Sequence, residues 1–452
     1  MANEPAVMSR TPWGPAEKLR ERALPPGPGT PREVGEKNQL DRVFGAMVAC
    51  VANQGYEATT VRDLLELSGV SRSSFYSHFR DKEDCFLATL AALEKMGADV
   101  FYGGLDGEGT PREKAHRAVG RTLQAVAANP AAANLYNQTA YALGPRGRDA
   151  LEKSMADFAP VLARAMAGIT GREELPPKMI RAILGGAQFL VQVHLRRGEH
   201  ERIPGLADPL IEWALGYEAP PTPLRLAGRQ PKTVDSYPPA YVAYSPAERI
   251  IRALAATAGE RGYPSVTIAE IAARAQMSQA TFYAHFEDKE AALVAALDSS
   301  AMQTLAAVVP AARRAPDWPN GLRAGIGALC YFAAAEPDFA RLATVETYAA
   351  GPKALEQRDT SIEMIRVLMH PGFKLAGKDF DPIVADAVLG AMWGLFYSQI
   401  VNEGPESMPE IAPLATYIGL SPFIGAEKAA AVANGDGRGS RSRPTTAPDS
   451  PT

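Results

Sequence analysis

Two segments of fourteen residues share a pattern of side chains that could contact an anion. The first, SRSSFYSHFRDKED, begins at Ser71, and the second, SQATFYAHFEDKEA, begins at Ser278. In both, Phe-Tyr-x-His-Phe is followed by Asp-Lys-Glu, in which the aspartate can cap a helix. Helix N-terminal amides beside a lysine form an anion site, so the pattern predicts phosphate contacts at Lys82 and Lys289. Asp-Lys-Glu is also typical of an ordinary solvated helix start.

Other kinds of chemistry find little support in the sequence. Cys50, Cys85 and Cys330 are an odd number and lie in apolar helical patterns, which favours reduced core residues over disulfides. His194 and His200 do not have the spacing of metal ligands, so we expect no metal and no cofactor. No paired carboxylates, activated nucleophile or phosphate loop occurs at informative spacing, which makes an enzyme the least favoured reading.

Composition limits the class of protein. The 452 residues are 46% apolar, enough for about two to four folding units. No uninterrupted apolar run of about 18 residues and no secretory pattern at the start is present, so we expect a cytoplasmic protein without a membrane segment. Net charge is -4, and residues 37–90 carry six basic and seven acidic side chains, so any DNA claim depends on local features.

An internal repeat organises the chain. Gly55 and Gly262 are related by an offset of 207 residues, which pairs the two motifs without a gap. The offset still holds further along, where YALGP (141–145) meets YAAGP (348–352). A unit of about 200 residues is too long for a solenoid, so we expect two similar domains in tandem. Apolar residues recur every three or four positions, which predicts an all-α fold.

The repeat and the composition together divide the chain into seven parts. These are a disordered tail (1–35), a first helix-turn-helix domain (36–90), a first helical domain (91–217), a proline-rich linker (218–245), a second helix-turn-helix domain (246–297), a second helical domain (298–426) and a disordered tail (427–452).

Local signals place each motif on a tight helical turn. Thr60 can cap a helix with Asp63 completing a capping box, and TIAE repeats this in the second copy. Gly69 can then end that helix in the left-handed conformation, and Ser71 can cap the next. The second copy has Gln276 in place of Gly69, which costs about 1 kcal/mol in a left-handed turn. In the third helix, Phe75 and Phe79 lie one turn apart and are expected to pack into the core, so that the polar residues of this helix point outward.

The pattern GY-x-x-T-T-V-x-x-L … GVS-x-x-x-FY-x-HF-x-DKE resembles the DNA-binding domain of the tetracycline-repressor-like (TetR/AcrR) family of bacterial regulators. The match covers about 30 residues and occurs twice. The resemblance implies a third helix that faces the major groove and lysines that hold phosphate. By that resemblance the DNA-binding residues are Arg62, Arg72, Ser73, Ser74, Tyr76, His78 and Lys82 in the first copy, and Thr267, Gln279, Ala280, Thr281, Tyr283, His285 and Lys289 in the second.

The same resemblance implies that the rest of each unit binds an effector and dimerises through its last two helices. These would be about 176–197 with 208–217, and about 381–402 with 409–418. Their small residues would permit close approach, although core packing explains them equally well: Gly185, Gly186, Ala187, Gly390 and Ala391. Candidate pocket residues for a small hydrophobic effector are Tyr141, Phe189, Tyr348, Trp393 and Phe396, which could instead fill a core.

The leading hypothesis is a transcriptional regulator, a repressor, in which two linked units form an intrachain pseudo-dimer. Arg72 is replaced by Gln279 and Ser73 by Ala280, so we expect an asymmetric double-stranded DNA operator, with guanine favoured on one side and adenine on the other. The alternative is a ligand-binding or protein-interaction module that has lost DNA binding in one or both units. The sequence leaves open whether two chains pair again.

Overall fold

The computed structural model describes residues 10–25, 31–226, 245–377, 381 and 383–436. As the apolar periodicity predicts, the described residues are almost entirely helical. Their strands are β1 (Arg10–Thr11) and β2 (Gly14–Pro15), which pair antiparallel in a two-residue hairpin.

The first unit begins with short turns and continues as a series of helices. In chain order these are η1 (Ala16–Lys18), η2 (Arg20–Arg22), α2 (Arg32–Ala58), α3 (Val61–Ser68), α4 (Arg72–His78), α5 (Lys82–Leu105), α6 (Pro111–Ala128), α7 (Pro130–Asn134), η3 (Leu135–Thr139), α8 (Ala140–Ala142), α9 (Pro145–Thr170), α10 (Pro177–Arg196), η4 (His200–Leu206) and α11 (Ala207–Leu215).

The second unit repeats this order with differences near its end. Its elements are α12 (Pro246–Arg261), η5 (Tyr263–Ser265), α13 (Ile268–Arg274), α14 (Gln279–His285), α15 (Lys289–Arg313), α16 (Trp318–Ala335), α17 (Pro337–Thr344), η6 (Glu346–Ala349), α18 (Pro352–Arg366), η7 (Val367–Met369), α19 (His370–Ala376), α20 (Ile383–Glu403), η8 (Pro405–Ser407), α21 (Met408–Ile424) and α22 (Ala426–Ala433).

Both predicted tails contain ordered structure where the chain is described. Residues 10–25 fold onto α2: the Trp13 and Phe44 rings lie 5.5 Å apart, and Leu19 is fully buried against Gly45. At the other end, α22 buries four of its eight residues. The prediction of disorder overlooked that a few apolar side chains suffice when a neighbouring helix offers an apolar face. Residues 32–35 of the predicted first tail form the start of α2, whereas residues 1–9, 26–30 and 437–452 lie outside the described part, as do residues 227–244 of the predicted linker.

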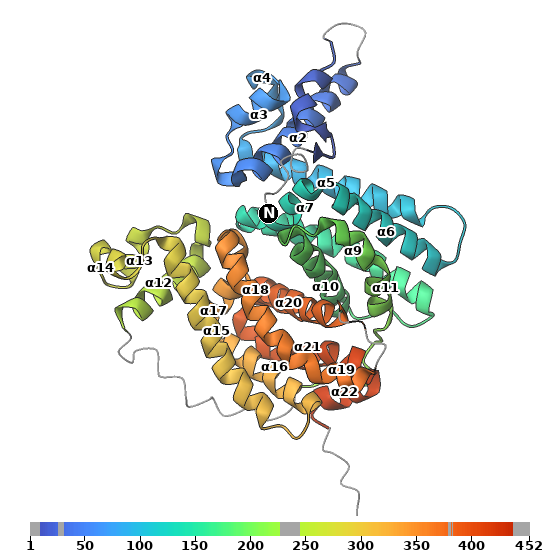
Figure 1. The fold of residues 1–452 in the computed structure, drawn as a ribbon, viewed down its shortest axis with the longest axis vertical. Coiled ribbons are helices and arrows are strands. Elements are labelled where there is room, and N and C mark those ends of the chain that lie inside the picture. The colour runs from blue at the N-terminus through green and yellow to red at the C-terminus, as the bar shows by residue number, and fades with distance from the viewer. Residues whose placement is uncertain (1–9, 26–30, 227–244, 378–380, 382, 437–452) are drawn as a thin grey trace, which may run out of the picture.

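Helices α10 and α20 bring the two units together at the centre of the molecule (Figure 1). Gly185 of α10 faces Gly394 of α20 so closely that a Cβ on Gly394 would lie 2.9 Å from the Gly185 Cα. A Cβ on Gly186 would lie 2.5 Å from the carbonyl oxygen of Ala387. Gly185 and Gly186 are among the small residues that the sequence singled out, whereas Gly394 was not.

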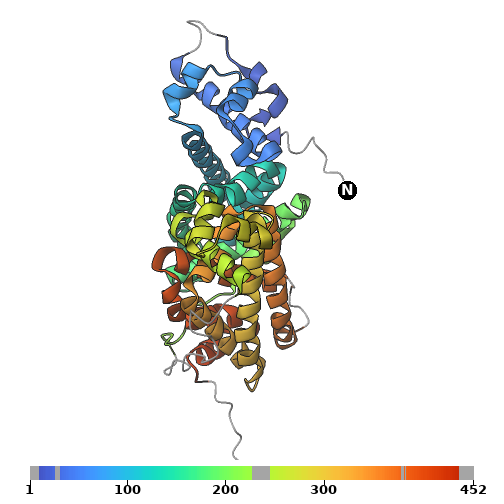
Figure 2. The ribbon, with the colours of Figure 1, turned by 90° about the vertical axis from the view of Figure 1, so that its left-hand side faces the viewer.

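The two helix-turn-helix motifs lie at the outer ends of this assembly. Figure 1 shows α2 to α4 at the top and α12 to α14 at the left, with α10 and α20 below the first group and to the right of the second. After a turn of 90°, Figure 2 shows the blue helices of the first motif standing above the rest of the protein.

Two described helices, α15 and α20, are long and apolar enough to cross a membrane by length and composition alone. Both pack against other helices of the chain, α15 against α16 and α20 against α10. The same composition suits a core helix, and on its own it is weak support for a membrane span.

Candidate nucleic-acid interface and the cavity between the units

The first motif has the caps that its sequence predicts. The Thr60 hydroxyl accepts from the Asp63 amide, and the Asp63 carboxylate accepts from the Thr60 amide at 2.8 Å, which completes the capping box at the start of α3. Gly69 ends α3 in the left-handed conformation with φ 65°, and Ser71 caps α4. Phe75 and Phe79 are buried beneath α4 with ring centroids 5.1 Å apart. The face of α4 that carries the polar residues is therefore fixed relative to the core.

The second motif reaches the same geometry with a less favourable residue in its turn. Gln276 has φ 56° and is the one described residue other than glycine with positive φ. The Met277 amide donates to the Ala272 carbonyl at 2.9 Å, and the Gln276 amide donates to the Ala273 carbonyl at 3.0 Å. These are the two bonds of a Schellman motif, so the helix end forms in spite of the strained residue.

Most of the predicted DNA-binding side chains of the first motif are exposed. Arg72, Ser73, Tyr76 and His78 project from α4, and Arg62 projects from α3. Ser74 and Lys82 are half-buried instead, and the Ser74 hydroxyl donates to the Gln39 side chain on α2. Helical periodicity alone placed Ser74 outward, but its position next to Phe75 turns it toward α2.

The second motif presents Gln279, Ala280, Tyr283 and His285 on the exposed face of α14. Thr281 is half-buried and shares a hydrogen bond of 2.9 Å with the Ser278 hydroxyl. Thr267 is exposed, but its hydroxyl and amide are both used in the capping box with Glu270.

The two lysines of Asp-Lys-Glu are engaged inside their own motifs. Lys82 Nζ donates to the carbonyls of Tyr56 at 2.8 Å and Glu57 at 3.4 Å and lies 4.1 Å from the Tyr56 ring centroid. Lys289 Nζ donates to the carbonyls of Tyr263, Pro264 and Val266. Burial lowers the pKa of both lysines. The lysine thus ties the loop after the glycine-tyrosine pair to the start of α5 or α15, a role that the sequence did not suggest.

Arginines around the motifs are paired with acidic side chains. Arg62 lies 2.7 Å from Glu66, Arg80 lies 3.1 Å from Asp84, and Arg274 lies 2.8 Å from Glu260. By contrast, Arg72 has its guanidinium 5.6 Å from the ring centroid of Tyr76 on the same exposed face. An arginine beside an exposed aromatic ring is well suited to contact a base edge.

A small pocket that is partly open to solvent lies between the two units. Four of the five predicted pocket residues meet there: Tyr141 and Phe189 from the first unit, and Tyr348 and Trp393 from the second. The fifth, Phe396, is half-buried against the core and does not line the cavity. The sequence had assigned these residues to their separate units, whereas the contact of α10 with α20 brings them into one site.

Three tyrosines form the aromatic wall of this cavity. Tyr141 stacks on Tyr348 with centroids 4.4 Å apart, and Tyr397 packs edge-on against both. Burial raises the pKa of Tyr141 and Tyr397, so both hydroxyls stay neutral at physiological pH. Trp393 donates its indole N–H to the Tyr348 hydroxyl at 3.2 Å.

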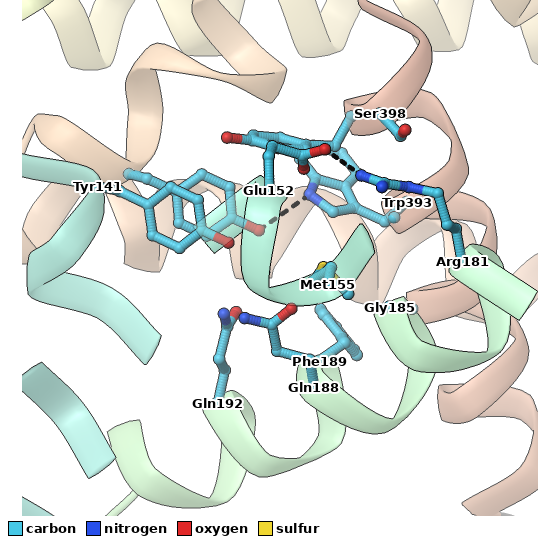
Figure 3. Close-up of a pocket in the computed structure, with 14 residues that line it drawn as sticks. Tyr141, Glu152, Met155, Arg181, Gly185, Gln188, Phe189, Gln192, Trp393 and Ser398 are labelled. Atoms are coloured by element: carbon cyan, nitrogen blue, oxygen red, sulfur yellow. Dashed lines mark hydrogen bonds and ion pairs between the residues drawn. The ribbon is translucent and has the colours of Figure 1, made fainter. Parts of the chain in front are cut away.

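The rest of the lining adds polar groups that sequence reasoning missed. Figure 3 shows Gln188 and Gln192 side by side on α10 below Tyr141, with Arg181 paired to Glu152 on another side. The Gln192 side chain donates to the Asn137 carbonyl at 2.9 Å. The available signal was the pair of glutamines spaced four apart within the otherwise apolar run AILGGAQFLVQVHL. Because aromatic and polar side chains line the cavity in equal number, it suits an organic ligand that carries polar groups.

A buried carboxylate near this cavity connects it to the second motif. Glu346 is 2% exposed, pairs with Arg148 of the first unit at 3.1 Å, and accepts from the Tyr263 amide at 2.8 Å. Tyr263 belongs to the glycine-tyrosine pair of the second motif and lies under Lys289. Because Glu346 lies two residues before Tyr348 of the cavity wall, one short segment contacts both the cavity and the second helix-turn-helix motif.

The three cysteines are free and buried, as their apolar surroundings predicted. Burial raises the pKa of the Cys50 thiol to about 11, and those of Cys85 and Cys330 further. These thiols are unreactive core side chains.

Comparison with known proteins matches both motifs to one family. A family model described as bacterial regulatory proteins of the tetR family matches residues 46–89 and 250–297. The repressor AcnR of Corynebacterium efficiens is 54% identical over 69 residues, which are 15% of this chain and 37% of AcnR. The repressor Rv1474c of Mycobacterium tuberculosis is 41% identical over 59 residues, 13% of this chain and 32% of the relative. The chain thus spans about a third of the length of these curated relatives.

Solved structures resemble parts of the chain. The fatty acid degradation regulator FadR from Bacillus halodurans has 15% identity and a TM-score of 0.36, covering 40% of this chain and 97% of its own. A bacterial regulatory protein of the tetR family from Rhodococcus RHA1 has 24% identity and a TM-score of 0.35, covering 41% of this chain and all of its own.

Proposed function

We propose that the chain is a DNA-binding transcriptional repressor that uses both of its helix-turn-helix motifs on one operator, because both motifs match the model of the tetR family of bacterial regulatory proteins. The observation that carries the proposal is the pair of exposed polar faces on α4 and α14, each held by the same caps and buried phenylalanines. The two faces belong to one chain whose units meet through α10 and α20. This arrangement supports an intrachain pseudo-dimer.

The operator of such a pseudo-dimer is asymmetric. Arg72 and Ser73 on α4 correspond to Gln279 and Ala280 on α14, and all four are exposed. Arginine binds guanine in bidentate fashion and glutamine binds adenine, so the two halves select different bases. The protein acts by occupying DNA and performs no chemical transformation.

An organic effector that occupies the cavity between the units releases the DNA. This part of the proposal is supported by the position of the cavity, whose wall is linked through Glu346 to Tyr263 of the second motif. A ligand that moves Tyr348 would change the orientation of α14 relative to the first motif, because Glu346 and Tyr348 lie on the same short helix, η6. Release then follows when the two faces no longer match one operator.

Operator selection from random DNA, followed by footprinting, tests the proposal with the full-length protein. We expect one protected site whose halves differ in sequence, and loss of that selection in the double variant Arg72→Ala/Gln279→Ala. Arg202→Ala is a matched control, because Arg202 is an exposed arginine on η4, away from both motifs. A perfect palindrome would contradict the asymmetric operator.

Failure to select any sequence would favour the alternative, a ligand-binding or protein-interaction module without DNA binding. The acidic partners of Arg62, Arg80 and Arg274 are the features that support this alternative. Gel-shift titration of the full-length protein against random fragments, at low and physiological salt, distinguishes the two cases.

A further inference from the structure

Two arginines from different units share one aspartate beside the cavity. Arg196 of α10 donates from Nε and Nη2 to the Asp359 carboxylate at 2.8 and 3.1 Å. Arg358 of α18 donates from Nε and Nη2 to the same carboxylate at 3.1 and 2.7 Å. Arg358 is 3% exposed, and the Arg196 side chain is 13% exposed. The cluster therefore holds two positive charges and one negative charge with little access to water.

Both guanidinium groups keep an unused donor. Nη1 of Arg196 and Nη1 of Arg358 are buried and have no hydrogen-bond partner among the described residues. The Tyr397 hydroxyl, in the wall of the neighbouring cavity, is also buried and has no hydrogen-bond partner among the described residues. Buried polar groups are almost always hydrogen-bonded, and a buried cation without a counter-charge is especially unfavourable. Burial and the nearby Arg358 lower the pKa of Arg196, as expected where positive charge exceeds negative charge.

The cluster adjoins the cavity through two of its lining residues. Arg196 lies one helical turn beyond Gln192 on α10, and the Arg358 guanidinium lies 4.7 Å from the ring centroid of Tyr348. Gln192 and Tyr348 both line the cavity. The two guanidinium groups lie behind Gln192 and Tyr348 and are not themselves lining residues, so a ligand in the cavity reaches their Nη1 donors only by displacing the Tyr348 ring.

We propose that this cluster and the cavity together bind an organic monocarboxylate, whose carboxylate is held by Nη1 of Arg196 and Nη1 of Arg358 and whose apolar body lies against the tyrosines. One negative charge balances the single excess positive charge of the cluster. A carboxylate has two oxygens, each of which can accept one charge-assisted hydrogen bond from one of the two Nη1 atoms. The inference deepens the proposed effector site and rests on the cavity being that site, but it does not depend on which DNA sequence is bound.

The assignment also explains why the site requires both units. Arg196 belongs to the first unit and Arg358 to the second, so the carboxylate bridges them. Tyr348 lies two residues after Glu346, the residue that accepts from the Tyr263 amide of the second motif. A ligand held at this place contacts the short helix that connects to α14.

Titration of the full-length protein without DNA tests the site. Sodium benzoate and sodium hexanoate are added at constant ionic strength against sodium chloride and inorganic phosphate, and thermal unfolding and tryptophan fluorescence are recorded. We expect saturable stabilisation by the carboxylates and a fluorescence change that is lost in Trp393→Phe, which removes the indole that lines the cavity. Equal stabilisation by chloride or phosphate would overturn the assignment to a carboxylate.

A variant that removes one guanidinium charge tests whether the arginines bind the carboxylate. In Arg358→Gln the benzoate concentration at half-saturation is expected to rise about tenfold, because one charge-assisted hydrogen bond is lost. Arg366→Gln is the matched control on the same helix, since Arg366 is already paired with Glu363 and Asp386. An unchanged half-saturation in Arg358→Gln would overturn the proposal.

The variant Asp359→Asn tests the same site without removing an arginine. It leaves two guanidinium groups without their own carboxylate, so benzoate should stabilise this variant more than the natural protein. A response equal to or smaller than that of the natural protein would contradict the site. Gel shifts with operator DNA in the absence of benzoate report on DNA binding separately, so failure of the anion site and failure of the repressor function are distinguished.

Discussion

The two helix-turn-helix motifs share their internal construction and differ in how they join the rest of the protein. Both have a threonine capping box, a serine cap and a lysine over a tyrosine ring. In both, an arginine of the first helix also donates to a carbonyl near the end of the second helix, Arg42 to Ser68 and Arg249 to Ala275. The residues that the two copies share are therefore mostly those that hold the motif together.

The attachments differ in their packing. The buried core of the first motif is continuous with the cluster that spans both units, whereas the second motif has its own cluster, which includes Phe282 and Phe339. Polar contacts also contribute to the attachment of the second motif, among them Glu346 with the Tyr263 amide and Arg252 with Glu336. The comparison suggests that the second motif is the one whose orientation responds to the cavity.

The largest expected effect comes from Glu346→Ala. Removing one partner of a buried ion pair costs about 3 kcal/mol, because Arg148 and the Tyr263 amide lose their acceptor. We expect faster amide hydrogen exchange across residues 246–297 and no change across 36–90, measured by mass spectrometry. Thr139→Ala is the control, since residue 139 is equivalent to Glu346 at the offset of 207. Equal acceleration in both motifs would contradict the separate attachment.

Substitutions on the recognition helices come next in size. Arg72→Ala should weaken operator binding by about 2 kcal/mol and relax base preference in one half-site only, because a bidentate contact with a base is lost. Gln279→Ala should relax the other half-site. Binding to a library of operators with single-base changes measures both effects. Loss of preference at the same bases in both variants would show that the two faces do not read separate half-sites.

Local features of both motifs could be predicted from the sequence because they depend on residues close together in the chain. The Thr60 and Ser71 caps, the left-handed turn at Gly69 and the strained Gln276 are each set within a few residues. The role of Lys82 escaped prediction because its carbonyl partners lie 25 and 26 residues away and depend on how the intervening helices pack. The order of residues 10–25 also depends on a neighbour, the apolar face of α2.

The residues that line the cavity also could not be placed together from the sequence, because they lie even further apart in the chain. Its aromatic residues were recognisable by type, but Tyr141 and Tyr348 are 207 residues apart, and only the contact of α10 with α20 stacks them. Arg196 and Asp359 are 163 residues apart and share no motif. Spacing in a sequence predicts neighbours on one helix, whereas a site between two units depends on the packing of both.

The lysines of the two motifs should contribute similarly to folding stability, by about 1 kcal/mol each, but differently to DNA binding. Lys289 uses all three donors on carbonyls, whereas Lys82 uses two and keeps a third without a partner among the described residues. Lys82→Met and Lys289→Met should each lower stability by about that amount. Only Lys82→Met should reduce the salt dependence of DNA binding, by about one unit of slope. A reduced slope in Lys289→Met would show that this ammonium leaves its carbonyls for phosphate.

The turn residues give the smallest effect and test the tolerance of each motif. Gln276→Gly removes the strain of a left-handed glutamine but adds chain entropy to the unfolded state, so a net stabilisation of about 0.5 kcal/mol is expected. Gly69→Ala should destabilise more than this, because φ is 65° and a Cβ there would lie 2.7 Å from Arg20 of the N-terminal segment. Urea denaturation of both variants measures the difference. Destabilisation by Gln276→Gly would mean that the glutamine side chain contributes contacts that outweigh its backbone strain.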